Sequence, residues 1–178
     1  MNTKINTKFN TKINTKINTR HAERRDLSFH CTGCLKEDLA QLEAGYLAGT
    51  LRTTGNWSAG ENLDHIAIMW EYSLDGAPPE AKVPFIIRLI APLMKRRATS
   101  GKTLPAGFKI PQNASYMMPR SGCSFEDGLA RLRKVLDRLD RGDQMTHASP
   151  AFGKLSHDEW MGLHLGHAQL HLGFVHPR

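Results

Sequence analysis

Residues 156–174 have the sequence SHDEWMGLHLGHAQLHLGF, and this segment decides the fold. Ser156, followed three residues later by Glu159, has the form of a capping box, which predicts the start of a helix. In a helical projection with about 100° per residue, most large side chains of this segment lie within about 60° of His167. They are Trp160, Leu163, His164, Leu170, His171 and Phe174. Because an apolar helix face packs inward, we expect these histidines to be buried or to line a cleft.

The same signals predict four further helices upstream of this segment. They are expected over residues 35–49, 58–76 and 85–97, and from Ser124 to Leu139. Pro92 could interrupt the third helix. A long loop, 98–123, then contains three prolines, and a loop of this length in a compact domain is usually functional. No strand-like alternation competes, so the sequence predicts an all-α fold: four main helices, with an extra helix and this loop between the second and third.

Residues 1–25 differ in composition from the domain predicted over 26–178. The first twenty residues repeat Asn-Thr-Lys followed by Ile or Phe, a pattern that favours neither helix nor strand, so we expect a disordered basic tail. This tail holds seven of the 24 basic residues and one of the 17 acidic ones. Residues 26–178 therefore carry a net charge of only +1 of the total +7. We expect no nucleic-acid partner for the folded domain.

The spacing of His167 and His171 places their Cβ atoms about 5–6 Å apart on one helix, so the two imidazoles could share a metal ion. The spacing alone is a weak signal, and a third ligand has to come from another helix. His65 is the best candidate, although periodicity alone leaves open whether it lines a cleft. Burying several neutral imidazoles together leaves polar atoms to satisfy, and a metal ion would satisfy them.

Three segments carry a family resemblance: residues 57–76 (WSAGENLDHIAIMWEYSLDG), 149–160 (SPAFGKLSHDEW) and 167–172 (HAQLHL). Over about residues 27–176, the chain resembles the DinB/YfiT-like metalloenzyme superfamily, in a branch known only as a domain of unknown function. The resemblance implies a four-helix bundle of DinB/YfiT type, whose metal ligands would be His65, His167 and His171. Better-known members often carry a second histidine directly before the final ligand and Arg-Gly after it. Here these positions hold Leu170, Leu172 and Gly173.

The resemblance also implies a function, because some relatives are thiol-dependent transferases or isomerases. We expect a divalent-metal-dependent enzyme with an open three-histidine site, acting as a transferase or hydrolase on a small molecule, with a low-molecular-weight thiol as a candidate partner. The alternative is a non-catalytic metal-binding or stress-response bundle. His164 is a candidate proton acceptor or a residue that orients a ligand, and its alternative is a hydrogen-bonded core histidine.

Three imidazoles suit zinc or nickel first, and iron, cobalt, copper or manganese as alternatives. The loop 98–123 is the candidate cover for the open position. The other histidines are expected to be exposed: His21, His30, His147, His157 and His176. A homodimer is one alternative for the oligomeric state.

Cys31 and Cys34 form a C-x-x-C, and Cys123 stands alone, which is no disulfide framework. A redox C-x-x-C normally follows a strand, and a zinc site would need a second cysteine pair, and the sequence predicts neither. We therefore favour the interpretation that these are two small residues near the start of a helix. The most apolar run, 83–94, is shorter than the roughly twenty residues of a membrane span and contains Arg88. We therefore expect a cytoplasmic protein without membrane contact.

Overall fold

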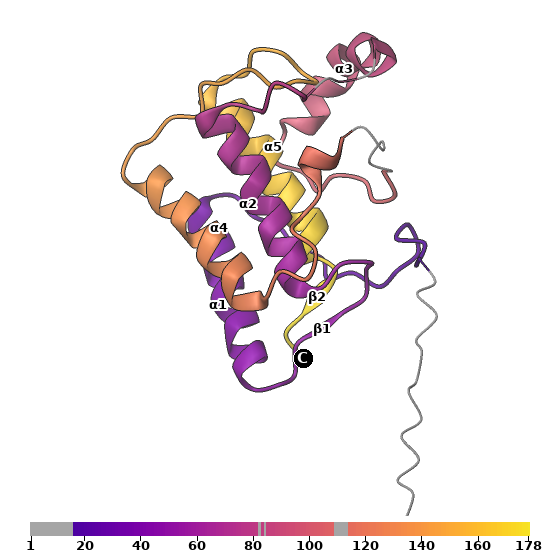
Figure 1. Cartoon of the computed structure of the whole chain (residues 1–178), viewed down its shortest axis with the longest axis vertical. Coiled ribbons are helices and arrows are strands. Elements are labelled where there is room, and N and C mark those ends of the chain that lie inside the picture. The colour runs from indigo at the N-terminus through magenta and orange to yellow at the C-terminus, as the bar shows by residue number, and fades with distance from the viewer. Residues whose placement is uncertain (1–15, 82, 84, 109–113) are drawn as a thin grey trace, which may run out of the picture.

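The computed structural model describes residues 16–81, 83, 85–108 and 114–178, so most of the predicted tail lies outside the described residues. Within these ranges the chain is mostly helical, as predicted, with little strand (Figure 1). The helices are α1 (Thr32–Leu47), α2 (Ala59–Asp75), α3 (Phe85–Ala98), α4 (Phe125–Asp140) and α5 (His157–Leu172). A short 3-10 helix, η1 (Ser115–Met117), precedes α4. Two strands, β1 (Arg52–Thr53) and β2 (Val175–His176), complete the described elements.

The predicted helix starts are confirmed by their caps. The Ser58 hydroxyl accepts from the Glu61 backbone N–H at 3.1 Å, and the Glu61 carboxylate accepts from the Ser58 N–H at 2.8 Å. Ser156 and Glu159 form the same reciprocal pair at the start of α5. At the start of α4, Ser124 accepts from the Asp127 N–H. These bonds satisfy backbone donors that a helix cannot pair internally, which is why the helices begin at these residues.

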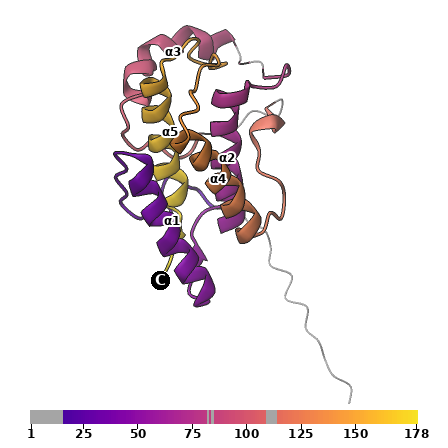
Figure 2. The ribbon, with the colours of Figure 1, turned by 90° about the vertical axis from the view of Figure 1, so that its left-hand side faces the viewer.

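The four longer helices enclose the core. α2 packs against α4 and α5, and α1 packs against the same two helices (Figures 1 and 2). α3 lies across one end and contacts α5. The core between the helices is apolar and includes Leu35, Leu39, Leu42, Leu63, Ile66, Trp70, Leu132, Leu136 and Leu172. Because α2 has neighbours on both sides, it is buried almost all round, and this brings one of its sides against α5.

Two details of the C-terminal segment differ from the prediction. α5 ends at Leu172 rather than at Phe174, because the chain turns there into β2. β2 pairs antiparallel with β1, with Arg52 opposite His176. The expectation of an exposed His176 is wrong, since the residue is buried in the strand pair, with 6% of its surface exposed.

Pro92 does not interrupt α3, and the helix runs through it. The solvent side of this helix carries apolar side chains, with Leu93 86% exposed and Leu89 62% exposed. No helix within the described ranges combines the length and apolarity needed to cross a bilayer.

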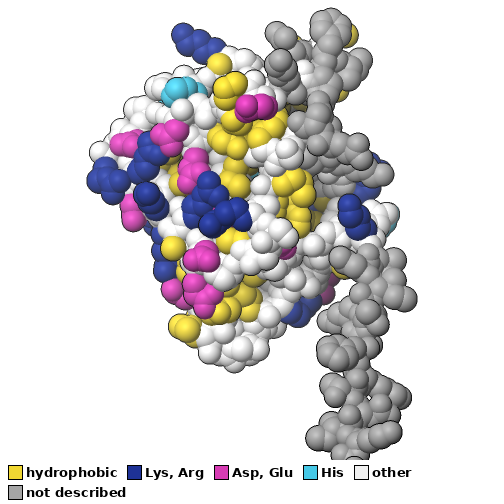
Figure 3. Space-filling model, in the orientation of Figure 1, with side chains coloured by type: hydrophobic (Ala, Val, Ile, Leu, Met, Phe, Trp, Pro, Cys, Tyr) yellow, Lys and Arg dark blue, Asp and Glu magenta, His cyan; other side chains and the backbone are white. Residues whose placement is uncertain are grey.

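Charges of both signs are interspersed on the side of the molecule where α4 lies (Figure 3). Three arginines of α4 make two-pronged contacts with carboxylates: Arg131 with Glu71, Arg133 with Glu43, and Arg138 with Asp75. These three arginines therefore serve as partners for carboxylates of α1 and α2.

Candidate metal centre

The structure brings together the three histidines that the sequence singles out. His65 projects from α2, and His167 and His171 project from α5. One ring nitrogen from each lies within 4.8 Å of the others, so the cluster could hold a metal ion. His65 is buried, and the other two residues are half-buried. The sequence predicts an inward face of α5 that is centred on His167. In the structure, the most enclosed side of α5 runs through His164 and Ala168, and His167 and His171 lie at the edge of that side.

The orientation of His65 follows from one hydrogen bond. Its Nδ1 lies 2.6 Å from the carbonyl oxygen of Met117 in η1. A carbonyl only accepts, so Nδ1 carries the proton and the lone pair of the neutral ring is on Nε2. That Nε2 lies 3.1 Å from Nε2 of His167. Two nitrogens bound to one tetrahedral zinc ion at about 2.0–2.1 Å would be about 3.3 Å apart, which is close to this separation.

Asn62 orients His171 in the same way. Its side-chain nitrogen donates to the carbonyl oxygens of Trp57, at 3.3 Å, and Ser58, at 2.9 Å. Its oxygen is therefore the atom that faces Nδ1 of His171, at 3.3 Å. Since this oxygen can only accept, Nδ1 of His171 is a donor, and Nε2 is left as the ligating atom.

His167 is the ring whose polar atoms are not all satisfied. Its Nδ1 is enclosed and has no hydrogen-bond partner among the described groups. Its Nε2 faces the unprotonated Nε2 of His65. His167 therefore turns one nitrogen, Nε2, toward the other histidines, and its Nδ1 has no partner among the described residues. The donor set fits a divalent cation of intermediate softness, which imidazole nitrogens bind well.

All three imidazoles are held in their neutral form. Burial lowers the pKa of His65 to about 4, against the opposing effects of the Met117 carbonyl and Asp64. Burial also lowers the pKa values of His167 and His171 well below the ordinary value, and repulsion from the neighbouring histidines adds to the effect. Because only neutral imidazole ligates, the cluster is ready to bind a cation at neutral pH.

Trp57 closes one side of the cluster. Its ring stacks on His171, with the centroids 5.3 Å apart and the planes at 16°, and lies tilted on His65 at 4.8 Å. Trp57 directly precedes the Ser58 cap, a position at which apolar residues commonly support a helix start. An indole here removes water from one side of the rings and restricts their rotation.

The predicted covering loop contacts both helices that carry the histidines. Residues 99–104 run along α5, where the carbonyl oxygen of Gly166 accepts from the Leu104 N–H at 3.2 Å. Residues 114–120 run along α2, where the Tyr72 hydroxyl donates to the Tyr116 carbonyl at 2.7 Å. Residues 109–113, between these two arms, lie outside the described part of the chain.

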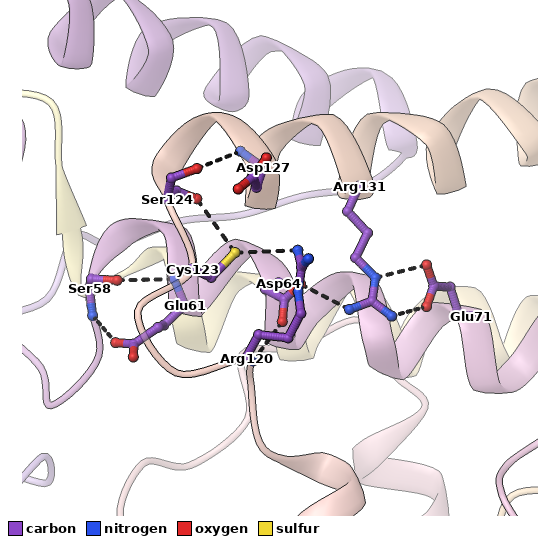
Figure 4. A network of polar contacts seen from close by, with 9 residues as sticks. All are labelled: Ser58, Glu61, Asp64, Glu71, Arg120, Cys123, Ser124, Asp127 and Arg131. Carbon is purple, nitrogen blue, oxygen red and sulfur yellow. Dashed lines mark hydrogen bonds and ion pairs between the residues drawn. The ribbon is translucent and has the colours of Figure 1, made fainter.

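The buried carboxylate of Asp64 anchors the second arm to α2 (Figure 4). Asp64 accepts from the backbone N–H of Arg120 at 2.8 Å and from the guanidinium groups of Arg120 and Arg131, both at 2.9 Å. Burial alone raises the pKa of Asp64, but these bonds outweigh it and hold the pKa below its usual value. The ionised Asp64 thus fixes the loop a few residues after Met117.

The structure places His164 apart from the cluster, in the core. Its ring lies between Trp70 and Trp160, with centroid distances of 4.8 and 4.9 Å. Its Nε2 lies 3.0 Å from the Ser73 hydroxyl, whose own proton goes to the Trp70 carbonyl. His164 therefore donates from Nε2, and burial lowers its pKa to about 3. These contacts are those of a hydrogen-bonded core histidine, and a proton-accepting role stays a prediction.

Sequence reasoning missed three groups of this site: Asn62, Trp57 and the carbonyl of Met117. Asn62 precedes His65 by three residues, so its place on the same side of a helix was a usable signal. Trp57 resembles an ordinary apolar residue before a helix cap. The Met117 carbonyl has no sequence signal, because almost every residue offers the same group.

Comparison with known proteins places the chain in a family. The model of one family matches residues 21–178, most of the chain. The curated proteins and the solved structures compared with this chain gave no match. The chain belongs to the family described as "Protein of unknown function (DUF1569)".

Proposed function

We propose that this protein binds one divalent metal ion through His65, His167 and His171 and is a metal-dependent enzyme that acts on a small molecule. The observation that carries the proposal is the convergence of three neutral imidazoles from two helices. Two of them are turned toward the common point by carbonyl acceptors at their Nδ1 atoms. The cyclic contacts of α1, α4, α2 and α5 support a four-helix bundle of DinB/YfiT type as the scaffold.

An open coordination position distinguishes the enzyme proposal from a structural metal. Structural zinc sites are normally closed by four protein ligands. Among the described residues, no carboxylate or thiolate joins the three imidazoles. When bound, a divalent ion would act as a Lewis acid and lower the pKa of a coordinated water or thiol. Zinc and nickel are the first candidates, and iron, cobalt, copper and manganese are the others.

The protein's own groups would prepare the ligands for this chemistry. The Met117 carbonyl and the Asn62 side chain hold Nδ1 protonated in His65 and His171, which orients each Nε2 and increases its basicity. Trp57 keeps water from one side. A thiol-dependent transferase or a hydrolase acting on a small molecule fits these properties.

Metal content tests the binding proposal. The purified chain should contain about one divalent ion, and His65→Ala, His167→Ala and His171→Ala should each lose most of it, measured by elemental analysis. His30→Ala, which changes an exposed histidine, is the matched control and should keep the ion. Circular dichroism confirms that each variant is folded. Full occupancy in His65→Ala would show that the two histidines of α5 have another partner.

The open position is tested with cobalt. A cobalt-substituted sample should change its visible absorption spectrum when a low-molecular-weight thiol such as glutathione is added. The same protein should stay folded when a chelator removes the metal, because the apolar core is separate from the histidine cluster. If the chelator unfolds the chain and the added thiol leaves the cobalt absorption spectrum unchanged, the metal is structural and the non-catalytic alternative holds.

A further inference from the structure

Cys31 and Cys34 meet at the start of α1, and neither belongs to the histidine cluster. Cys31 is the N-cap of this helix, with an extended backbone at φ −157° and ψ 170°, and Cys34 lies in the first turn. The predicted position near a helix start is confirmed. The structure adds that the two Sγ atoms lie 3.3 Å apart. Cys31 is exposed and Cys34 is half-buried, so the first of the two thiols is open to solvent.

The helix start favours the thiolate form of Cys31. Its Sγ accepts from the backbone N–H of Cys34 at 3.5 Å and faces the Cys34 thiol. These contacts, with a smaller one from the Gly33 N–H, lower the pKa of Cys31 against the effects of burial and of the Glu37 carboxylate. The positive end of the α1 dipole acts in the same direction. A thiol so placed is a better nucleophile at neutral pH.

Cys123 provides an internal comparison, because its surroundings raise the pKa of its thiol whereas those of Cys31 lower it. Its Sγ lies 3.4 Å from the Arg120 guanidinium and 3.5 Å from the Ser124 carbonyl (Figure 4). Burial, and next the Asp64 carboxylate, raise the pKa of Cys123. Of the three cysteines, Cys31 therefore combines exposure, stabilisation of the thiolate and a second sulfur within reach.

We propose that Cys31 and Cys34 form a thiol–disulfide exchange site whose substrate is a low-molecular-weight disulfide. The Cys31 thiolate attacks one sulfur of the disulfide, a new S–S bond forms, and the first small thiolate leaves and takes a proton from water. Cys34 loses its proton to water and attacks Sγ of Cys31, which expels the second small thiolate, and this thiolate takes up a proton from water as the first did. Two electrons pass from the protein dithiol to the small disulfide, which becomes two thiols.

The second step needs little rearrangement. The two Sγ atoms have to approach from 3.3 Å to the S–S bond length of about 2.0 Å. The Cys31 carbonyl accepts the first backbone bond of α1 from the Leu35 N–H, and turning the Cys31 side chain leaves that bond in place. The exchange uses none of the three histidines and does not depend on the proposed metal chemistry.

The test uses the full chain, reduced and kept without oxygen, with oxidised glutathione as the probe and mass spectrometry as the measurement. The unaltered chain should end as a Cys31–Cys34 disulfide that has lost two hydrogens. Cys34→Ser should accumulate one glutathione on Cys31. Cys31→Ser should react at least about tenfold more slowly, because the activated thiolate is gone. Cys123→Ser is the control and should react like the unaltered chain.

Folding does not confound this test. Serine is a good N-cap residue, so Cys31→Ser should keep α1. A second measurement needs no variant: limiting iodoacetamide should label Cys31 before Cys34 and Cys123, as peptide mapping would show. The proposal is wrong if the unaltered chain keeps its free thiols, if Cys34→Ser reacts no faster than Cys31→Ser, or if Cys123 is labelled first.

Discussion

At the residue scale, two oxygen atoms determine which nitrogens of the cluster face one another. The Met117 carbonyl and the Asn62 amide oxygen each occupy Nδ1 of a histidine and leave its Nε2 free. Such partners hold a ligand ring in one tautomer and one orientation, so they affect metal affinity without touching the ion.

Asn62→Leu should weaken metal binding about 10- to 100-fold while leaving all three histidines in place. The reason is that Nδ1 of His171 loses its acceptor and the ring can turn. Affinity is measured by competition with a chromophoric chelator. Asn56→Leu, which removes an exposed amide bonded to the Ile17 backbone, is the control and should bind normally. Equal affinities for the two variants would contradict the role of Asn62.

His164 should make stability depend on pH. Its pKa is about 3 in the folded chain and about 6.5 when unfolded, so between these values the unfolded state binds the extra proton. Its contribution is complete above about pH 6.5 and is lost as the pH falls toward 3, by about 1.4 kcal/mol per unit at most. Urea denaturation at several pH values gives the free energy of unfolding as a function of pH. Below about pH 6.5 this free energy should fall less steeply for His164→Gln than for the unaltered chain. Parallel slopes for the two proteins would contradict the burial of a neutral His164.

At the element scale, α5 is enclosed because two of its glycines admit the loop. A Cβ on Gly162 would lie 2.1 Å from the Thr99 carbonyl oxygen, and one on Gly166 would lie 2.4 Å from that of Lys102. The backbone of residues 99–102 therefore approaches the helix more closely than any side chain would allow. This contact places the first arm of the loop beside the helix that carries His167 and His171.

Gly162→Ala should displace this arm and lower the free energy of unfolding by about 1–3 kcal/mol, because the methyl group meets backbone rather than a movable side chain. Gly33→Ala in α1 is the matched control, since its nearest atom is the Cys31 Sγ at 3.4 Å. That change should be neutral or stabilising, as alanine favours a helix. Equal thermal midpoints for Gly162→Ala and Gly33→Ala would show that the loop moves away from the added methyl group without cost.

At the scale of the whole molecule, the segment before α1 ties distant elements together. The Arg25 guanidinium pairs with Asp38 of α1 through bonds of 2.6 and 2.8 Å and donates to the Leu172 carbonyl at the end of α5. Its backbone N–H donates to the Gly173 carbonyl. Asp38 is buried, so this pair lies inside the fold although Arg25 falls within the segment expected to be a tail.

Deleting residues 1–15 should leave the thermal midpoint nearly unchanged, because the repeat lacks the apolar surface needed to build a core. Deleting residues 1–25 should destabilise the chain, since Asp38 would keep a buried charge without its partner, and breaking such a pair costs about 3–5 kcal/mol. Arg25→Met in the full chain isolates this contact and should reproduce most of the loss. A large effect of the shorter deletion would show that the repeat packs onto the domain.

The sequence by itself indicated the helical class, the capped starts of α2, α4 and α5, and the histidine pair on the last helix, with His65 as the best candidate for a third. Caps and periodicity are local properties of the chain, so residues a few positions apart reveal them. The closeness of His65 to the pair on α5 needed either a family resemblance or the structure. Two helices far apart in sequence meet only through packing.

Only the tertiary structure decided which nitrogens face the cluster, that His164 belongs to the core and that His176 is buried. Each depends on a partner distant in sequence: the Met117 carbonyl, Ser73, or the strand β1. The end of α5 at Leu172 also comes from pairing with β1, which overrides the local helical pattern. The 3.3 Å approach of the two sulfurs is different, because the C-x-x-C spacing permits it and the extended cap conformation of Cys31 produces it.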